Sequence, residues 1–317
     1  MSSDDSPQVP ELGEARTDGL IVLTYHRVGD PTTTAFDPWV FTVDAEQLEA
    51  QIRFFQGRHR LVGLEEALEI ASGRRRSPGL AVLLTFDDGY LDNYEVALPV
   101  LRSLGVEAVF FLTTGFLGGS AIAWWDRMAW LVRSAKERCF RLPQGGGITE
   151  LDLRDQSAPD AIKLVLDLYK ACSAEDAPRF VESLEAAPRT DEHPPRERLF
   201  LGPDEARALS AAGMSIGAHS HNHPILARLS PQAQLQELRL SRAILEGEMG
   251  SPVEVLAYPV GGPEDFTPVT RAMAQGCGYR AAFSCYGGVN PPGGCDLYDI
   301  KRVPVYWGAQ PEWLLGL

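Results

Sequence analysis

Cationic residues are scarce in this sequence. Its 317 residues include 29 Lys and Arg against 43 Asp and Glu, which gives a formal net charge of −14 at pH 7. Nucleic-acid binding depends on clustered Lys and Arg that neutralise phosphates, so we expect no nucleic-acid partner. The basic run at residues 74–76 lies among Gly, Ser and Pro residues and is interpreted as a solvated loop.

Cysteine is also sparse. The chain has five, an odd number without Cys-x-x-Cys spacing: Cys139, Cys172, Cys277, Cys285 and Cys295. This pattern disfavours a disulfide framework and favours a reducing compartment. Because no two of the last three cysteines have the spacing of zinc ligands, the sequence does not predict a cysteine zinc site.

Long hydrophobic segments are absent. The longest uncharged stretch, residues 108–125, is interrupted by Thr, Ser and Gly, and it predicts a buried strand and a glycine-rich loop rather than a membrane helix. Residues 1–19 are polar and acidic and are interpreted as a flexible N-terminal tail without a signal peptide. As written, the sequence predicts a cytoplasmic protein with no membrane-spanning segment, although a piece lacking its export signal would look the same.

Apolar segments of strand length alternate with amphipathic segments along most of the chain. This rhythm predicts βαβ units and a parallel sheet, and about seven units favour a barrel over an open sheet. The expected strands are residues 20–25, 80–86, 108–112, 214–218, 253–258, 279–283 and 300–306. The expected helices between them are residues 45–56, 64–71, 94–104, 203–212, 231–249 and 268–275.

One segment departs from this rhythm. Residues 124–198 contain no convincing strand but show helical patterns at 125–138 and 161–171. Gly-Gly-Gly at 145–147 and Pro-Pro at 194–195 indicate loops within the segment. We interpret it as a helical insertion in a barrel that spans residues 20–317.

The clearest chemical signal is the motif Thr-Phe-Asp-Asp-Gly at residues 85–89, which follows an apolar strand. The carboxyl ends of parallel strands form the active-site edge of α/β folds, so Asp87 and Asp88 are candidate functional residues. One could bind a cation while the other moves a proton. A helix N-cap followed by a turn explains the same residues equally well.

Histidines supply a second signal. Three of the six occur within five residues, and His219 and His223 are four apart, a spacing that lets both contact one cation. Two imidazoles and one carboxylate form a common open metal site with room for water and substrate. His221 lies between them and is expected to point elsewhere. A histidine-rich surface loop is the alternative.

These motifs, with Leu-Ala-Tyr-Pro-Val-Gly at residues 256–261, resemble the ordered motifs of the polysaccharide deacetylases, carbohydrate esterase family 4. The likeness covers roughly residues 20–305. It implies a distorted (β/α) barrel of about seven parallel strands and metal-dependent removal of N-acetyl groups from amino sugars. It further implies that Asp87 is the catalytic base and that Asp88, His219 and His223 hold the metal.

The residue types suit this chemistry independently of the resemblance. A divalent cation polarises a carbonyl and acidifies a bound water, whose proton Asp87 could accept. The backbone N–H of Val260 could stabilise the oxyanion. Tyr258 could line the sugar pocket or simply pack at a strand end. We expect zinc, with cobalt, nickel or manganese as alternatives, because His/Asp sites follow metal availability.

The sequence differs from the common family pattern at two places. Ala257 stands where many members carry the arginine that holds the catalytic aspartate, and Arg302 is a candidate substitute. No histidine follows His223, so the usual general acid is missing from its usual place. The segment at residues 23–28 resembles the element that a circularly permuted branch carries near the N-terminus, which implies that His26 is the acid.

We therefore expect a hydrolase acting on the N-acetylhexosamine units of a polysaccharide, oligosaccharide or glycoconjugate. The alternatives are an amidohydrolase for a small N-acyl or N-formyl sugar conjugate, and a carbohydrate-binding protein without activity. The sequence leaves the substrate, the metal and the oligomeric state open.

Overall fold

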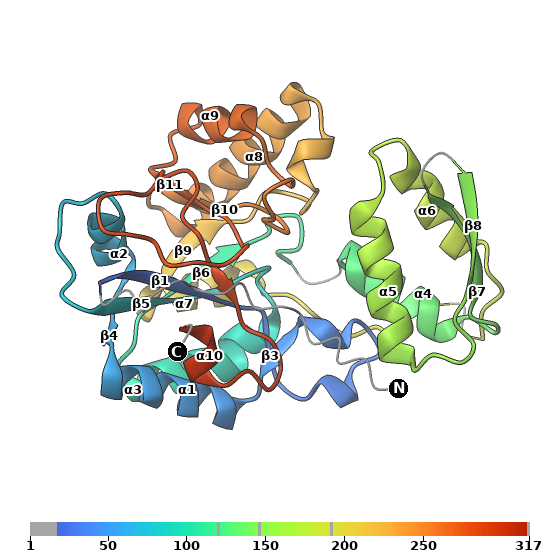
Figure 1. Cartoon of the computed structure of the whole chain (residues 1–317), viewed down its shortest axis with the longest axis horizontal. Helices are drawn as coiled ribbons and strands as arrows, with labels where there is room; N and C mark the ends of the chain where they lie inside the picture. Colours follow the sequence, from blue (N-terminus) through green and yellow to red (C-terminus); the bar gives the residue numbers. More distant parts are fainter. Residues whose placement is uncertain (1–17, 119–120, 145–146, 191–192, 316–317) are drawn as a thin grey trace.

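A computed structural model describes residues 18–118, 121–144, 147–190 and 193–315. Its centre is one parallel sheet (Figure 1). The strands are β1 (Gly19–Tyr25), β4 (Arg60–Leu61), β5 (Leu80–Phe86), β6 (Ala108–Leu112), β9 (Ser215–Ala218), β10 (Val255–Ala257), β11 (Ala281–Phe283) and β12 (Val303–Pro304). A separate parallel pair joins β2 (Arg27–Val28) to β3 (Phe41–Val43).

The sheet curls into a distorted barrel. Seven strands follow the order β11-β10-β9-β6-β5-β1-β12, and β4 pairs with β5 outside this path. A parallel bridge between Phe283 and Ile300 connects the β11 edge to the segment that leads into β12. The expected distorted (β/α) barrel with about seven parallel strands is thus confirmed.

Helices lie above and below the sheet in the view of Figure 1. They are α1 (Ala45–Arg58), α2 (Leu64–Ala71), α3 (Leu98–Leu104), α7 (Pro203–Ala211), α8 (Pro231–Met249), α9 (Pro268–Gly276) and α10 (Pro311–Leu314). A π-helical turn, Asn93–Ala97, leads into α3. Short 3-10 turns cover Pro31–Thr33, Pro38–Val40 and Leu226–Arg228.

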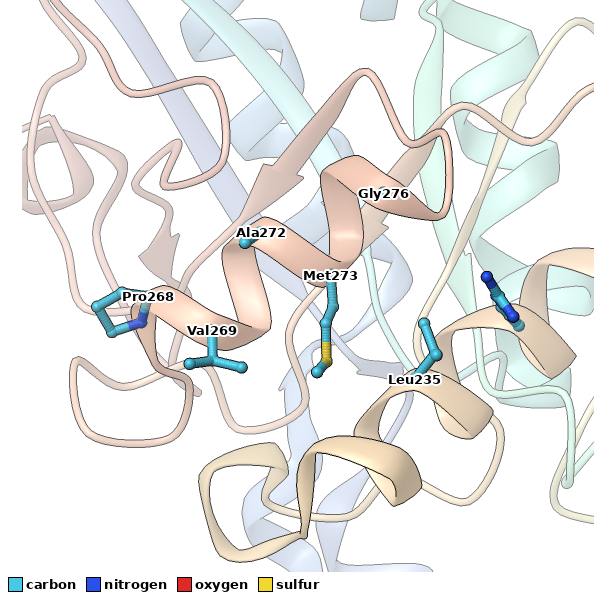
Figure 2. Close-up of a pocket in the computed structure, with 7 residues that line it drawn as sticks. Leu235, Pro268, Val269, Ala272, Met273 and Gly276 are labelled. Carbon is cyan, nitrogen blue, oxygen red and sulfur yellow. The ribbon is translucent and has the colours of Figure 1, made fainter.

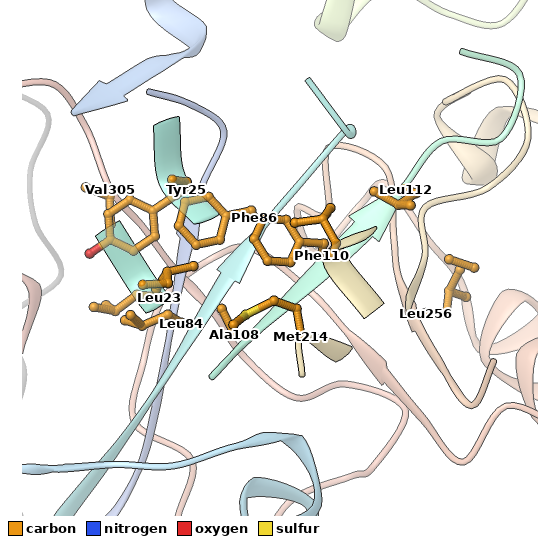
Figure 3. Close-up of a cluster of buried hydrophobic side chains, with 14 of the residues drawn as sticks. Leu23, Tyr25, Leu84, Phe86, Ala108, Phe110, Leu112, Met214, Leu256 and Val305 are labelled. Carbon is orange, nitrogen blue, oxygen red and sulfur yellow. The ribbon is translucent and has the colours of Figure 1, made fainter. Parts of the chain in front are cut away.

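Aromatic rings from neighbouring strands pack in the hydrophobic layer between the sheet and its helices. Tyr25 of β1, Phe86 of β5 and Phe110 of β6 stack in a row, with ring centroids 5.1 and 4.9 Å apart (Figure 3). All three side chains are fully buried. Burying such a side chain contributes about 1.5–3 kcal/mol, so these rings hold three adjacent strands in fixed register beneath the edge where the strands end.

The insertion forms a separate layer beside the barrel (Figure 1). It comprises α4 (Trp124–Ser134), β7 (Cys139–Gln144), β8 (Gly147–Asp152), α5 (Ala158–Ala171) and α6 (Asp176–Glu185). The expectation that this segment lacks strands is wrong, because β7 and β8 form an antiparallel hairpin. The two glycines between its strands, residues 145–146, lie outside the described residues, yet Gly-Gly between short alternating runs is a hairpin signal.

Other boundaries also differ from expectation. The last strand is only Val303–Pro304, because the chain from Ile300 contacts β11 first and β1 only three residues later. The first strand begins at Gly19, and residues 1–17 of the expected tail lie outside the described residues. No helix in the described part of the chain is long and apolar enough to cross a membrane.

We expect the substitution Gly217→Ala in β9 to destabilise the fold by about 1–3 kcal/mol, as overpacking typically does. An added Cβ would lie 2.5 Å from the Phe111 ring and 3.1 Å from Val255 Cγ2. The matched control is Gly247→Ala in α8, where nothing lies within 4 Å of the new atom. It should stabilise the protein by about 0.5–1 kcal/mol. Urea unfolding measures both, and equal effects would contradict the packing argument.

Candidate metal and catalytic site

The residues singled out by sequence meet at the carboxyl edge of the sheet. Asp87 and Asp88 follow β5, His219 follows β9, and β6 lies between these two strands. His26 directly follows β1, the other neighbour of β5. Because parallel strands all end at one edge, residues up to 197 positions apart in sequence become neighbours.

Asp88, His219 and His223 form a buried triangle of donor atoms. Asp88 Oδ1 lies 3.5 Å from His219 Nε2 and 3.3 Å from His223 Nε2, and the two nitrogens are 3.2 Å apart. An ion with ligand bonds of about 2.0–2.1 Å in tetrahedral geometry has ligand atoms about 3.3–3.4 Å apart. The spacing therefore fits one small divalent cation held by these three residues.

The surroundings of the triangle favour the same conclusion. Nδ1 of His219 is 2.8 Å from the carbonyl oxygen of Ala257, to which it donates as the protonated nitrogen, so that Nε2 is free to bind a cation. Asp88 Oδ1 is buried without a hydrogen-bond partner among the described residues. A buried acceptor of this kind is costly unless something else satisfies it.

Asp87 is held by Arg302 rather than by the triangle. Arg302 Nη1 donates to Asp87 Oδ1 at 2.7 Å and Nη2 donates to Oδ2 at 2.8 Å, in a buried bidentate pair. The same guanidinium donates to Thr85 Oγ1 and to the carbonyl of Ser284. Arg302 thus holds Asp87 in place of the family's usual arginine, whose position in this sequence is occupied by the uncharged Ala257.

The charges at the site follow from burial and this ion pair. Burial alone would raise the pKa of Asp87, but Arg302 and then His219 outweigh it and lower the pKa to about 2. Burial, with the charges of Asp87 and Asp126, raises the pKa of Asp88 well above its usual value. Burial also lowers the pKa values of His219 and His223, so both imidazoles are neutral metal-binding forms.

His26 lies close enough to Asp87, Arg302 and His219 for their charges to shift its pKa. Burial lowers the pKa of His26 to about 4, Asp87 opposes that shift, and Arg302 and His219 add to it. In the protein without substrate, desolvation therefore outweighs the attraction of Asp87, and the His26 imidazole is neutral at neutral pH.

Backbone strain is concentrated at the same edge. Among the described residues, four that are not glycine have positive φ: Asp88 at 72°, Ser220 at 62°, His223 at 56° and Val260 at 61°. Such conformations cost about 1–3 kcal/mol each and cluster at functional sites. At Val260, the N–H of Gly261 donates to the carbonyl of Pro259 at 2.6 Å, which closes a γ-turn. The Val260 N–H has no partner among the described residues.

Tyr258 belongs to the core rather than to a substrate pocket. Its side chain is fully buried, its ring stacks on Phe266 at 4.2 Å, and its hydroxyl donates to the carbonyl of Tyr298. Of the two interpretations offered by sequence, packing at a strand end is correct. The pocket interpretation is wrong because no surface of the side chain reaches solvent.

Sequence reasoning missed the network that supports His223. The Trp125 ring meets the His223 ring edge-on at 4.6 Å, and Trp125 Nε1 donates to the hydroxyl of Tyr90. That hydroxyl donates to Asp126 Oδ2 at 2.8 Å. Burial, with the charge of Asp37, raises the pKa of Asp126 to about 7. The adjacent Trp-Trp-Asp at residues 124–126 was the available signal, but it reads equally well as a helix start.

A second support fixes the histidine loop itself. The Glu237 carboxylate of α8 accepts the backbone N–H groups of His221 and Asn222 at 2.8 Å, and also the Asn222 amide. His221 points away from the triangle, as expected, because its Nδ1 lies 2.8 Å from Thr114 Oγ1. The loop is therefore positioned by α8 and not by the metal ligands alone.

Two cavities lie near or beyond this site. The larger, about 520 Å³, is bounded by α8 and α9, including Leu235, Val269 and Met273 (Figure 2), and none of the site residues line it. The smaller, about 340 Å³, has His223 in its wall. Because His223 is one of the candidate metal-binding residues, only the smaller cavity borders the candidate site.

Comparison with known proteins gives concordant matches. The family model described as polysaccharide deacetylase matches residues 74–149 and 172–282. YxkH of Bacillus subtilis (strain 168), assigned as a polysaccharide deacetylase, is 31% identical over 292 residues, which are 90% of this chain and 71% of YxkH.

Solved structures share the fold. IcaB from Ammonifex degensii is 21% identical with a TM-score of 0.59, over 93% of this chain and 94% of IcaB. The Streptococcus pyogenes deacetylase PplD, solved in complex with acetate, is 19% identical with a TM-score of 0.60, over 95% of this chain and 98% of PplD. At these identities the likeness shows the architecture alone. It does not test the circular permutation, which stays a prediction.

We expect His223→Ala to lose a bound divalent cation, because it removes one corner of the donor triangle. His221→Ala is the matched control: it changes a histidine in the same loop that contacts Thr114 instead. Metal content per chain after dialysis, measured by elemental analysis, distinguishes them. Full metal occupancy in His223→Ala would overturn the assignment.

Proposed function

The chain belongs to the polysaccharide deacetylase family, and we propose that it is a metal-dependent hydrolase that removes N-acetyl groups from N-acetylhexosamine units of a polysaccharide, oligosaccharide or glycoconjugate. One observation carries the proposal. The buried triangle of Asp88, His219 and His223 lies beside the buried Asp87–Arg302 pair, with His219 Nε2 only 3.6 Å from Asp87 Oδ2. The three candidate cation ligands and the ionised Asp87 carboxylate therefore lie around the same position.

Asp88, His219 and His223 would hold the metal, and zinc, cobalt, nickel and manganese all suit such ligands. When bound, the metal supplies a Lewis acid that polarises the acetamide carbonyl and acidifies water. A positive charge at this position would also stabilise the buried Asp88 carboxylate, whose pKa is raised by burial.

Asp87 is the group that accepts the proton of the attacking water. Its low pKa keeps it ionised at neutral pH, so it is always in the accepting form. The bidentate pair with Arg302 fixes the orientation of both oxygens. A carboxylate with so low a pKa is a weak base, so it depends on an acidified water as its partner.

Val260 supplies the donor for the developing oxyanion. Its N–H has no partner among the described residues, and the γ-turn fixes its direction. Donors that are already oriented before the reaction stabilise charge without reorganisation. This accounts for a β-branched residue held at a φ of 61°.

His26 is the proton donor to the departing amine. Its imidazole is neutral in the substrate-free protein, so it must gain a proton during the reaction before it gives one up. Asp87, whose charge raises the pKa of His26, favours that uptake. The carbonyl of His26 accepts the Asn93 amide at 2.7 Å, which positions the residue at the end of β1.

We expect Asp87→Asn to retain the metal and to lower kcat by about 10²–10⁴-fold, because it keeps the shape while removing proton affinity. Acetate release from chito-oligosaccharides and metal content are the two measurements. If the variant loses its metal instead, Asp87 and Asp88 have exchanged roles.

We expect His26→Ala to lower kcat by a similar factor with unchanged metal content, because the departing amine loses its donor. The exposed His193 of the insertion provides the control substitution, His193→Ala. A fully active His26→Ala enzyme means that the proton comes from another group.

A further inference from the structure

The cavity beside His223 is mainly apolar. It has a volume of about 340 Å³ and lies between α5 and α6 of the insertion and the loop that follows the histidine motif. The rings of Trp124 and Tyr169, with centroids 4.9 Å apart, form one part of its wall. Aliphatic side chains form most of the rest: Ala177, Val181, Ile225 and Leu229.

The cavity shares one residue with the candidate metal site. His223 lines it and also contributes Nε2 to the donor triangle. Trp124 Nε1 donates to the carbonyl of His223 at 3.2 Å, which ties the cavity wall to that ligand. A substrate whose acetamide lies at the triangle would therefore have this cavity beside one of the three donor residues.

Two of the polar side chains in the wall have hydrogen-bond partners within the protein. Arg228 Nη2 donates to the carbonyls of Tyr169 and Lys170 at the end of α5. The Asn222 amide donates to Glu237. Because apolar side chains form most of the wall, a sugar ring placed here would leave several of its hydroxyl groups without partners, at about 1–3 kcal/mol for each unsatisfied group. An alkyl or aryl group pays no such penalty and gains from burial.

We propose that this cavity is a subsite for an apolar group, alkyl or aryl, carried by the amino-sugar substrate. The proposal rests on the proposed function, since it places the acetamide at the donor triangle. The volume lies at the lower end of the range for small-ligand pockets, about 300–1,000 Å³, and therefore fits a short chain or one ring. Such a group reaches the cavity either from the anomeric carbon or as a longer acyl chain on the nitrogen.

The experiment compares two series of substrates with the metal-loaded enzyme. One series keeps the N-acetyl group and varies the glycoside from methyl to butyl to octyl. The other keeps the methyl glycoside and varies the acyl group from acetyl to butanoyl to hexanoyl. Each buried methylene contributes about 0.8 kcal/mol, or about fourfold in kcat/KM. A stepwise rise in either series supports the subsite and identifies the source, while flat kcat/KM in both overturns it.

Two cavity variants and one control assign any rise to this cavity. Ala177→Trp fills the space, and Val181→Thr adds a hydroxyl at nearly constant volume. Both should reduce the gain per methylene. Glu182→Trp, on the exposed side of α6, should leave the gain as in the parent enzyme. A gain that survives both cavity variants, with folding verified by circular dichroism, overturns the proposal.

Binding separates this proposal from the proposed function. Calorimetric affinity for the alkyl glycosides can be measured on the full chain even if no substrate is turned over. Affinity that rises with chain length, and does so less in Ala177→Trp, supports the subsite while absent turnover rejects only the hydrolase. Turnover without any dependence on chain length rejects only the subsite.

Discussion

The buried pair of Arg302 and Asp87 is the interaction on which the rest of the site depends. Both side chains are almost wholly inaccessible, and the guanidinium contacts β5 through Thr85 and the end of β11 through the carbonyl of Ser284. Burying two charges is expensive, and removing one partner of such a pair typically costs about 3–5 kcal/mol. The pair therefore joins the last strand segment of the barrel to β5 while it holds Asp87 ionised. One ion pair therefore both links the strands that close the barrel and keeps the Asp87 carboxylate ionised.

The second constraint is the electrostatic imbalance that remains after this pair forms. Asp87 and Asp88 are adjacent, yet only Asp87 has a guanidinium, so their pKa values move in opposite directions. The positive φ of Asp88, Ser220 and His223 has an energetic cost, and Glu237 stabilises the loop that carries the last two of these residues. Backbone strain, an unpaired buried acceptor and neutral imidazoles occur together at the donor triangle, as the proposed cation site requires. The energetic cost of these strained backbone positions is part of the folded state itself.

Much of this could be predicted from sequence where the signal is local. Pro231–Met249 matches its predicted bounds because Ser230 caps it and Pro231 begins it. The continuous apolar run of β5 likewise marks a strand buried on both faces. Other features depend on distant partners. Tyr258 is buried because Phe266 and Tyr298 happen to cover it, and Trp125 supports His223 only because α4 returns to the barrel edge. The β7–β8 hairpin is not predicted from sequence, because consecutive glycines indicate a loop as readily as a hairpin turn.

The insertion shares its hydrophobic interior with the barrel, and this limits how such proteins can diversify. Its buried cluster includes Phe36, Tyr90 and Phe200 from outside the insertion, and Tyr90 is two residues from Asp88. The Tyr90 hydroxyl also donates a hydrogen bond to Asp126 of α4. Residues 124–198 are therefore not an exchangeable module: a chimera that transplants them must carry matching residues around position 90.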